Sequence, residues 1–117
     1  MSEHEWIAVR KVMRTDVHFV DGKTTILDAM RTMKKVSATC LIVNKRHGKD
    51  EYGMVTFKDI AKKVIAANRA PERVNVFEIM TKPVISVDPL MDIRYCARLF
   101  ENFGIARAPV IDKGEVI

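Results

Sequence analysis

The chain is 117 residues long, 48% of its residues are hydrophobic, and its formal net charge is +5. This size and composition suit one compact domain, or two halves that share a core. A membrane-spanning chain is disfavoured because no apolar run reaches about 18 residues, and the acidic N-terminus is unlike a signal peptide. We therefore expect a soluble, cytoplasmic protein.

The positive charge would suit a polyanionic partner. However, the 20 Lys and Arg residues are scattered in small groups, and only 7% of the chain is aromatic. Nucleic-acid-binding surfaces combine a basic stripe with aromatic side chains that stack on bases. We therefore expect attraction of phosphate at a defined site and no general binding of nucleic acid.

The residues that usually carry metal or covalent chemistry are isolated from one another. Cys40 and Cys96 lie in apolar segments, as buried reduced thiols do. The three histidines have no second ligand at metal spacing, so no metal site is expected. Nothing assembles an acid, a base and a nucleophile, so the chain is not expected to be an enzyme.

An internal repeat dominates the sequence. Residues 13–21 and 80–88 share one pattern, opening with Met13 and Met80 at a separation of 67 residues. Each copy is followed by an amphipathic stretch and a short apolar run. A period of this length predicts two small units that bury apolar faces, and clefts between such halves often bind ligands.

The first half predicts a short strand, a helix, two strands and a second helix. Thr25 and Asp28 form a capping-box pattern that marks the start of the first helix. Its apolar face is formed by Ile26, Ala29, Met30, Met33 and Val36. Strands are expected over residues 17–20, 40–43 and 52–56, with a charged surface loop over 45–51. The second helix is expected to begin near Lys58, and its inward-facing residues are expected to be Ile60, Ala61, Val64 and Ile65.

The second half repeats this order. Residues 68–76 are polar and are expected to link the halves, followed by a helical turn over 77–80. Strands are expected over 84–87 and 108–111, with a hairpin turn at Lys113 and Gly114. A helix over 92–103 is expected to bury Ile93, Cys96, Leu99, Phe100 and Phe103. By the repeat, a further Gly-x-x-Thr strand and a final helix should follow Ile117.

Taken in order, these phrases resemble a tandem pair of cystathionine-β-synthase (CBS) domains, the Bateman module. The strongest marks are the Met-x-x-x-Val openings, the phrase over residues 53–59, and the Arg-x-Pro-Val-x-Asp pattern from Arg107. The resemblance implies an α/β (α+β) fold of two βαββα-type repeats in a pseudo-two-fold pair. Its parts would be repeat 1 over 10–68, a linker over 69–79, and repeat 2 over 80–117, which lacks its last strand and helix.

The resemblance also implies a function. Such modules bind adenine nucleotides or related adenosyl ligands between their halves and report occupancy to a partner or an attached domain. No cofactor is required, and AMP, ADP or ATP would be the regulatory ligand, AMP-like ligands first. The module is also expected to form a homodimer. Two alternatives stay open: a structural dimerisation domain without a ligand, and a regulatory fragment of a larger enzyme or transporter.

The phrase over residues 53–59 has a chemistry that suits a nucleoside. Gly53 has no Cβ where a base or ribose could approach the strand. Thr56 offers a hydroxyl, and the Asp59 carboxylate is an acceptor suited to the two hydroxyls of a ribose. The same Thr-x-x-Asp spacing is also a capping box, which stabilises a helix without any ligand.

The remaining site residues follow from the resemblance. Met54 would join the adenosine site, and the strip of Pro83, Val84 and Ile85 would contact the base. Arg107 would bind phosphate, or serve only as a surface cation. Thr39 stands at the position equivalent to Arg107 in the first half, so one phosphate or none is favoured over three. A second cleft would use Val17 and His18.

Overall fold

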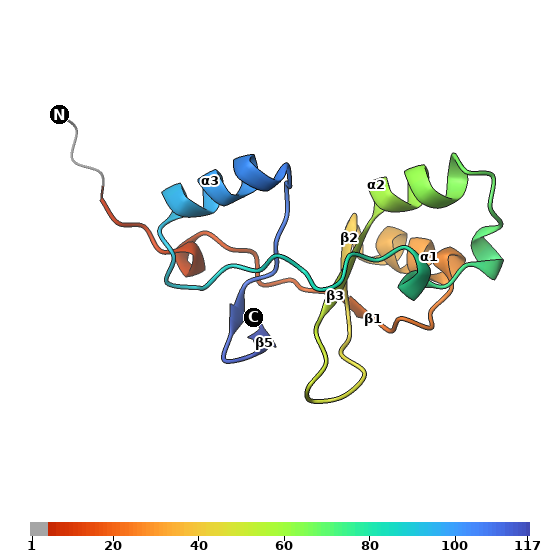
Figure 1. Cartoon of the computed structure of the whole chain (residues 1–117), viewed down its shortest axis with the longest axis horizontal. Coiled ribbons are helices and arrows are strands. Elements are labelled where there is room, and N and C mark those ends of the chain that lie inside the picture. The colour runs from red at the N-terminus through yellow and green to blue at the C-terminus, as the bar shows by residue number, and fades with distance from the viewer. Residues whose placement is uncertain (1–4) are drawn as a thin grey trace. The chain divides into compact units, whose positions relative to one another are not determined.

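The computed structural model describes residues 5–117, which form two units (Figure 1). The first unit is Val17–Val84. The second unit is Ile85–Ile117 together with the N-terminal segment up to Asp16. Each unit thus joins most of one sequence repeat to the segment that precedes the other repeat.

The first unit is a three-stranded sheet with its helices on one face. The strands β1 (Phe19–Val20), β2 (Cys40–Val43) and β3 (Gly53–Thr56) lie in the order β1-β2-β3. β1 pairs with β2 in parallel, and β3 pairs with β2 antiparallel. Figure 1 shows α1 (Ile26–Val36) and α2 (Phe57–Ile60) on the same side of this sheet.

α1 begins and ends as its sequence predicts. The Thr25 Oγ1 accepts a hydrogen bond from the Asp28 backbone N–H at 3.2 Å, which satisfies one of the free donors of the first turn. Ser37 ends the helix in the left-handed conformation. The apolar face of α1 buries Ile26, Ala29 and Met33 in the core of the unit. The predicted helix and its cap are confirmed.

α2 continues into a π-helical segment, Ala61–Ile65. Ile60 and Val64 are fully buried, as predicted. Ile65, however, is 49% exposed, so its predicted inward position is wrong. The Ala66 backbone N–H donates to the Ala61 carbonyl at 2.7 Å, which makes this turn wider than an α-turn. The extra residue per turn carries Ile65 past the buried face.

The segment between the repeats belongs to the core of the first unit. It contains two 3-10 helices, Pro71–Arg73 and Val76–Glu78. Its buried side chains are Val74, Val76 and Ile79. The Ile26 backbone N–H donates to the Val74 carbonyl at 2.8 Å, so the segment is also bound to the start of α1.

The second unit contains the 3-10 helix Val9–Lys11, α3 (Ile93–Phe103), and the hairpin of β4 (Ile111–Asp112) and β5 (Glu115–Val116). The predicted hairpin turn is confirmed. Lys113 and Gly114 both have positive φ, 51° and 82°, as a type I′ turn requires.

Each unit binds, in the same way, the segment that precedes the other repeat. In the first unit the backbone of Thr25 bridges Asn75, and in the second the backbone of Asp92 bridges Ala8. Each pair differs from its counterpart by the repeat period of 67 residues. The internal repeat is therefore a repeat of tertiary contacts as well as of sequence.

Two expectations for the second half are wrong, and the strand expected over 108–111 is displaced, because β4 begins only at Ile111. Residues 84–87 form no strand: Val87 alone makes a bridge, to Val110, and the adjacent Pro109 has no N–H with which to extend this pairing. α3 has no fully buried residue, and Phe103 is 60% exposed. In the described part of the second unit, no counterpart of β3 and α2 packs on α3, so its apolar face is only partly covered.

Within residues 5–117, none of the helices is both long enough and apolar enough to cross a lipid bilayer.

The burial of residues 74–79 gives a first prediction. Val76→Ala removes two methyl groups from a fully buried position and should lower the free energy of unfolding by about 2 kcal/mol. Phe77→Ala, at the neighbouring exposed position, is the control and should cost less than about 1 kcal/mol. Urea denaturation measures both; equal, small losses would contradict the placement of this segment in the core.

Candidate ligand-binding site

The junction of β3 and α2 brings Thr56 and Asp59 together. Thr56 ends β3 and caps α2: its Oγ1 accepts a hydrogen bond from the Asp59 backbone N–H at 3.1 Å. The same hydroxyl donates to Asp59 Oδ2 at 2.9 Å. Asp59 is half-buried, and its Oδ1 accepts no hydrogen bond from any residue within 5–117. One carboxylate oxygen is thus held in place while the other is available as an acceptor.

The segment that follows Met80 lies beside β3. Met54 and Thr81 exchange two backbone hydrogen bonds, each 2.9 Å long. Pro83, which is exposed, and Val84, which is half-buried, follow this bridge directly in the chain. Six predicted site residues therefore belong to the first unit: Gly53, Met54, Thr56, Asp59, Pro83 and Val84.

The need for glycine at position 53 has a structural explanation that involves no ligand. A Cβ at this position would lie 2.8 Å from Met80 Sδ and 3.2 Å from Val43 Cβ. Val43 belongs to the core, so the missing side chain of Gly53 faces the helices. The close approach at Gly53 is made by Met80, and the predicted approach of a base or ribose stays a prediction.

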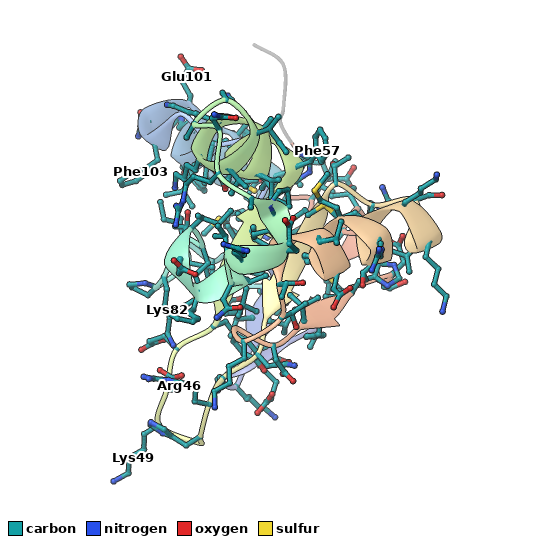
Figure 2. The ribbon with its side chains drawn as sticks, turned by 90° about the vertical axis from the view of Figure 1, so that its right-hand side faces the viewer. Arg46, Lys49, Phe57, Lys82, Glu101 and Phe103 are labelled. Atoms are coloured by element: carbon teal, nitrogen blue, oxygen red, sulfur yellow. The ribbon has the colours of Figure 1, made fainter. Side chains whose placement is uncertain are left out.

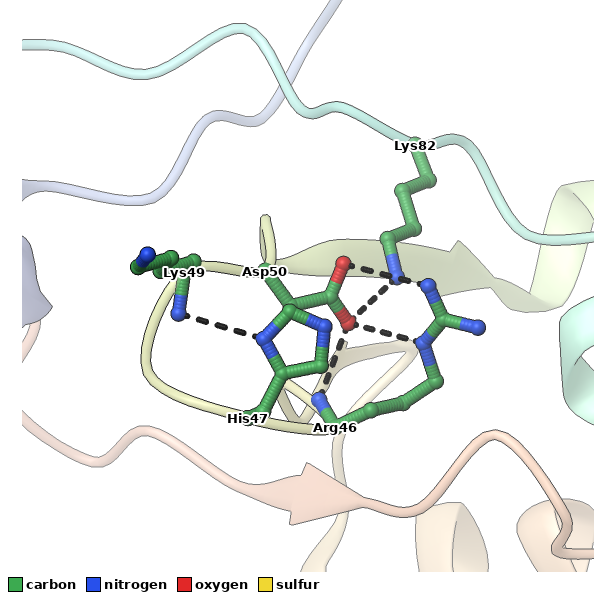
Figure 3. Close-up of polar contacts among 5 residues, drawn as sticks. All are labelled: Arg46, His47, Lys49, Asp50 and Lys82. Atoms are coloured by element: carbon green, nitrogen blue, oxygen red, sulfur yellow. Dashed lines mark hydrogen bonds and ion pairs between the residues drawn. The ribbon is translucent and has the colours of Figure 1, made fainter.

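A cluster of charges at the base of the β2–β3 loop adjoins this segment (Figure 3). Asp50 Oδ2 accepts hydrogen bonds from Lys82 Nζ at 2.8 Å, from the Arg46 backbone N–H at 2.9 Å and from Arg46 Nε at 3.0 Å. The Asp50 side chain is only 7% exposed and that of Lys82 21%, whereas Arg46 is 76% exposed. Figure 2 shows Lys49 at the outer tip of the same loop.

These contacts change the titration of Asp50. Hydrogen bonds from the Arg46 guanidinium, then from Lys82 and the Arg46 backbone, hold the pKa of the Asp50 carboxyl well below its ordinary value. Sequence reasoning placed residues 45–51 in a surface loop and missed this site. The one available signal was the acidic pair Asp50 and Glu51 among the basic residues of this loop, and nothing local indicated a partner 32 residues away.

The other predicted residues are more dispersed. In the first unit the His18 carbonyl accepts from the Ile42 backbone N–H at 2.9 Å, which places Val17 and His18 at the start of β1. Ile85 and Arg107 belong to the second unit, where Arg107 is exposed. The roles of these four residues stay predictions.

A cavity of about 310 Å³ also opens in the first unit. It is lined by Met30, Met33, Lys34, Ser37, Ala38, Thr39 and Phe57. None of the predicted ligand contacts lines it, and its lining offers no carboxylate for a ribose. The Phe57 backbone N–H donates to the Thr39 carbonyl at 2.8 Å, so the cavity adjoins Thr56 without including it.

Comparison with known proteins identifies the family. The family model for the CBS domain matches residues 9–66 and 76–117. The chain therefore belongs to the CBS-domain family and carries two copies of the domain, so the predicted family and mixed α and β fold are confirmed. Protein MK0525 of Methanopyrus kandleri is 31% identical over 108 residues, which are 91% of this chain and 54% of that protein.

Solved structures of similar proteins agree with this assignment. The hexameric CBS-CP12 protein from bloom-forming cyanobacteria is 39% identical with a TM-score of 0.93, over 95% of this chain and 61% of that one. The CBS-domain pair of protein MJ0100, solved with 5′-methylthioadenosine and S-adenosyl-L-methionine, has a TM-score of 0.80 over 95% of this chain and 88% of that one. At 22% identity it shows a shared fold alone. The chain spans little more than half of the length of MK0525.

The lowered pKa of Asp50 gives a second prediction. A carboxylate whose pKa is lowered by folding stabilises the fold fully above the unfolded-state pKa of about 3.9, and this stabilisation fades as the pH falls further. The difference in unfolding free energy between the unmodified chain and Asp50→Asn should stay constant from about pH 7 to about pH 5 and shrink below about pH 4. Urea unfolding across this range measures it. A difference that grew on acidification would contradict the lowered pKa.

Proposed function

We propose that this chain is a regulatory module that binds an adenosine-containing ligand, AMP-like first, and passes its occupancy to a partner or an attached domain. It acts by binding, not by catalysis. The observation that carries the proposal is the Thr56–Asp59 pair, in which the fold orients one carboxylate oxygen and leaves the other available. Such an acceptor suits the ribose hydroxyls, which are donors.

The neighbouring residues support a nucleoside over a simple anion. The antiparallel bridge between Met54 and Thr81 brings the segment that contains Pro83 and Val84 to the β3 strand, which also carries Thr56. An apolar strip favours the flat face of a base, while a carboxylate disfavours a bare anion. The proposed ligand therefore places its ribose at Asp59 and its base along Pro83 and Val84, with Ile85 extending the strip and Arg107 meeting any phosphate.

The comparisons support the ligand class and suggest assembly. The MJ0100 domain pair was solved with two adenosine derivatives, although its 22% identity carries the fold alone. The CBS-CP12 protein is hexameric. We propose that this chain also self-associates, at least as a dimer. Occupancy affects a partner only where the ligand binds one arrangement more tightly than another.

A purely structural role is the second candidate. The Thr56–Asp59 pair favours it in one respect, because the Thr56 hydroxyl caps α2 with or without a ligand. Calorimetric titration with adenosine, AMP, ADP, ATP and S-adenosylmethionine separates the two functions. Binding of an adenosine compound supports the sensor; no binding of any at about millimolar concentration, which corresponds to a free energy of about −4 kcal/mol, leaves the structural role.

The cap also provides a decisive variant. Asp59→Ala keeps the backbone donor that caps α2, so the unfolding free energy should fall by less than about 1 kcal/mol. Affinity for adenosine should fall by about tenfold to a hundredfold, as the loss of hydrogen bonds to a charged acceptor predicts. Calorimetry and thermal unfolding measure the two effects.

α1 offers the matched control. Asp28 follows Thr25 at the same spacing and donates its backbone N–H to Thr25 Oγ1 at 3.2 Å, while its exposed carboxylate pairs with Arg31 instead of a threonine hydroxyl. Asp28→Ala should match Asp59→Ala in stability while leaving adenosine affinity unchanged. A large stability loss with unchanged affinity in Asp59→Ala would show that Asp59 serves the fold alone.

The phosphate role of Arg107 is tested separately. Arg107→Ala should weaken AMP binding by about tenfold, the worth of a charge-assisted contact, and leave adenosine binding unchanged, because adenosine has no phosphate. The ratio of the two dissociation constants, measured by calorimetry, is the readout. An equal loss for both ligands would remove Arg107 from the phosphate site.

A further inference from the structure

We infer that Asp50 is a positioning residue for the base of the ligand: through Lys82 it holds Pro83 and Val84 in place beside β3. This inference rests on the proposed function, because it concerns the affinity of that same site. Asp50 contacts neither Pro83 nor Val84 by any described hydrogen bond. It acts through the side chain that directly precedes them.

The backbone of Lys82, Pro83 and Val84 is not held by hydrogen bonds in the described structure. Thr81 exchanges two hydrogen bonds with Met54, but from Lys82 to Val84 the described structure contains no backbone hydrogen bond. Pro83 has no N–H to donate. The bond of 2.8 Å from Lys82 Nζ to Asp50 Oδ2 is therefore the one hydrogen bond that the structure describes for these three residues.

The solvent exposure of the side chains shows which of the two ion pairs of Asp50, with Lys82 or with Arg46, restrains the strip. The Asp50 and Lys82 side chains are mostly shielded from solvent, so water and salt screen their attraction only partly. Arg46 is exposed, and within residues 5–117 its hydrogen bonds all go to Asp50 in its own loop. The Asp50–Lys82 pair joins that loop to the strip, whereas the Arg46 arm closes the loop on itself.

The loop itself is a firm anchor. The Asp50 backbone N–H donates to the His47 carbonyl at 3.1 Å, and the Lys49 backbone N–H donates to His47 Nδ1 at 3.2 Å. Figure 3 shows this contact of His47 with Lys49, and Arg46 and Lys82 converging on the Asp50 carboxylate. Since this compact turn is carried by β2 and β3, Lys82 is tied to the same sheet that carries Thr56.

The test measures binding of adenosine and AMP by calorimetry on the full chain. Asp50→Asn and Lys82→Met should each lower adenosine affinity by about threefold to tenfold. Because both substitutions remove the same interaction, the double variant should bind adenosine about as tightly as the weaker-binding of the two single variants. Arg46→Gln, the matched control, should change affinity by less than about twofold. Lys82→Arg keeps the pair and should restore most of the affinity.

The comparison of ligands excludes an electrostatic effect at a distance. Adenosine is neutral, so a positioning role predicts the same loss for adenosine and AMP. If Asp50 acted only through its charge, Asp50→Asn would strengthen AMP binding relative to adenosine, and that result overturns the inference. Unchanged adenosine affinity, or additive losses in the double variant, overturns it as well.

A ligand-free measurement separates this inference from the proposed function. Hydrogen exchange at the Thr81 amide, which donates to Met54, should speed up in Asp50→Asn and Lys82→Met and stay unchanged in Arg46→Gln. If the unmodified chain binds no adenosine, the proposed function fails. The exchange rates then decide whether Asp50 positions the strip: faster exchange supports it, and unchanged exchange overturns it.

Discussion

The pairing of Met54 with Thr81 is the contact on which the candidate site depends. It joins β3, which carries Thr56, to the segment that carries Pro83 and Val84. Two backbone hydrogen bonds alone would fix this junction weakly. They are supported from one side by the burial of Val76 and Ile79 in the core, and from the other by the ion pair of Lys82 and Asp50. The candidate site therefore combines β3 of the first repeat with the opening segment of the second repeat, which follows Met80.

The Thr-x-x-Asp spacing of Thr56 and Asp59 at the start of α2 is suited both to helix capping and to ligand binding. The structure assigns these two roles to different atoms. The cap of the helix is made by a backbone N–H, so it needs Thr56 and places no demand on the side chain of Asp59. The carboxylate is then held by the Thr56 hydroxyl, which orients it. A capping box and a ribose contact are thus compatible, and the choice between them that the sequence left open concerns only the second carboxylate oxygen.

The sequence predicted local features well and distant ones poorly. α1, its Thr25 cap and the hairpin at Lys113 were recognisable because each depends on neighbours within a few residues. The reason for Gly53 was missed, because Met80 fills its space from 27 residues further along the chain. The charge pair of Asp50 and Lys82 was missed for the same reason. The failed burial of Phe103 is different: an amphipathic pattern shows which face is apolar, but it does not show whether anything covers that face.

These contacts suggest where the first unit is easiest to deform. Elements held by few backbone hydrogen bonds open at lower free energy than a packed core does. By that criterion Lys82–Val84 is the softest part of the candidate site, and the carboxylate of Asp59, fixed on α2, is the firmest. A ligand that contacts both must order the mobile strip relative to the fixed helix. The free energy that this ordering costs makes the binding free energy less favourable. The Asp50–Lys82 pair reduces that cost by restraining the strip before any ligand arrives.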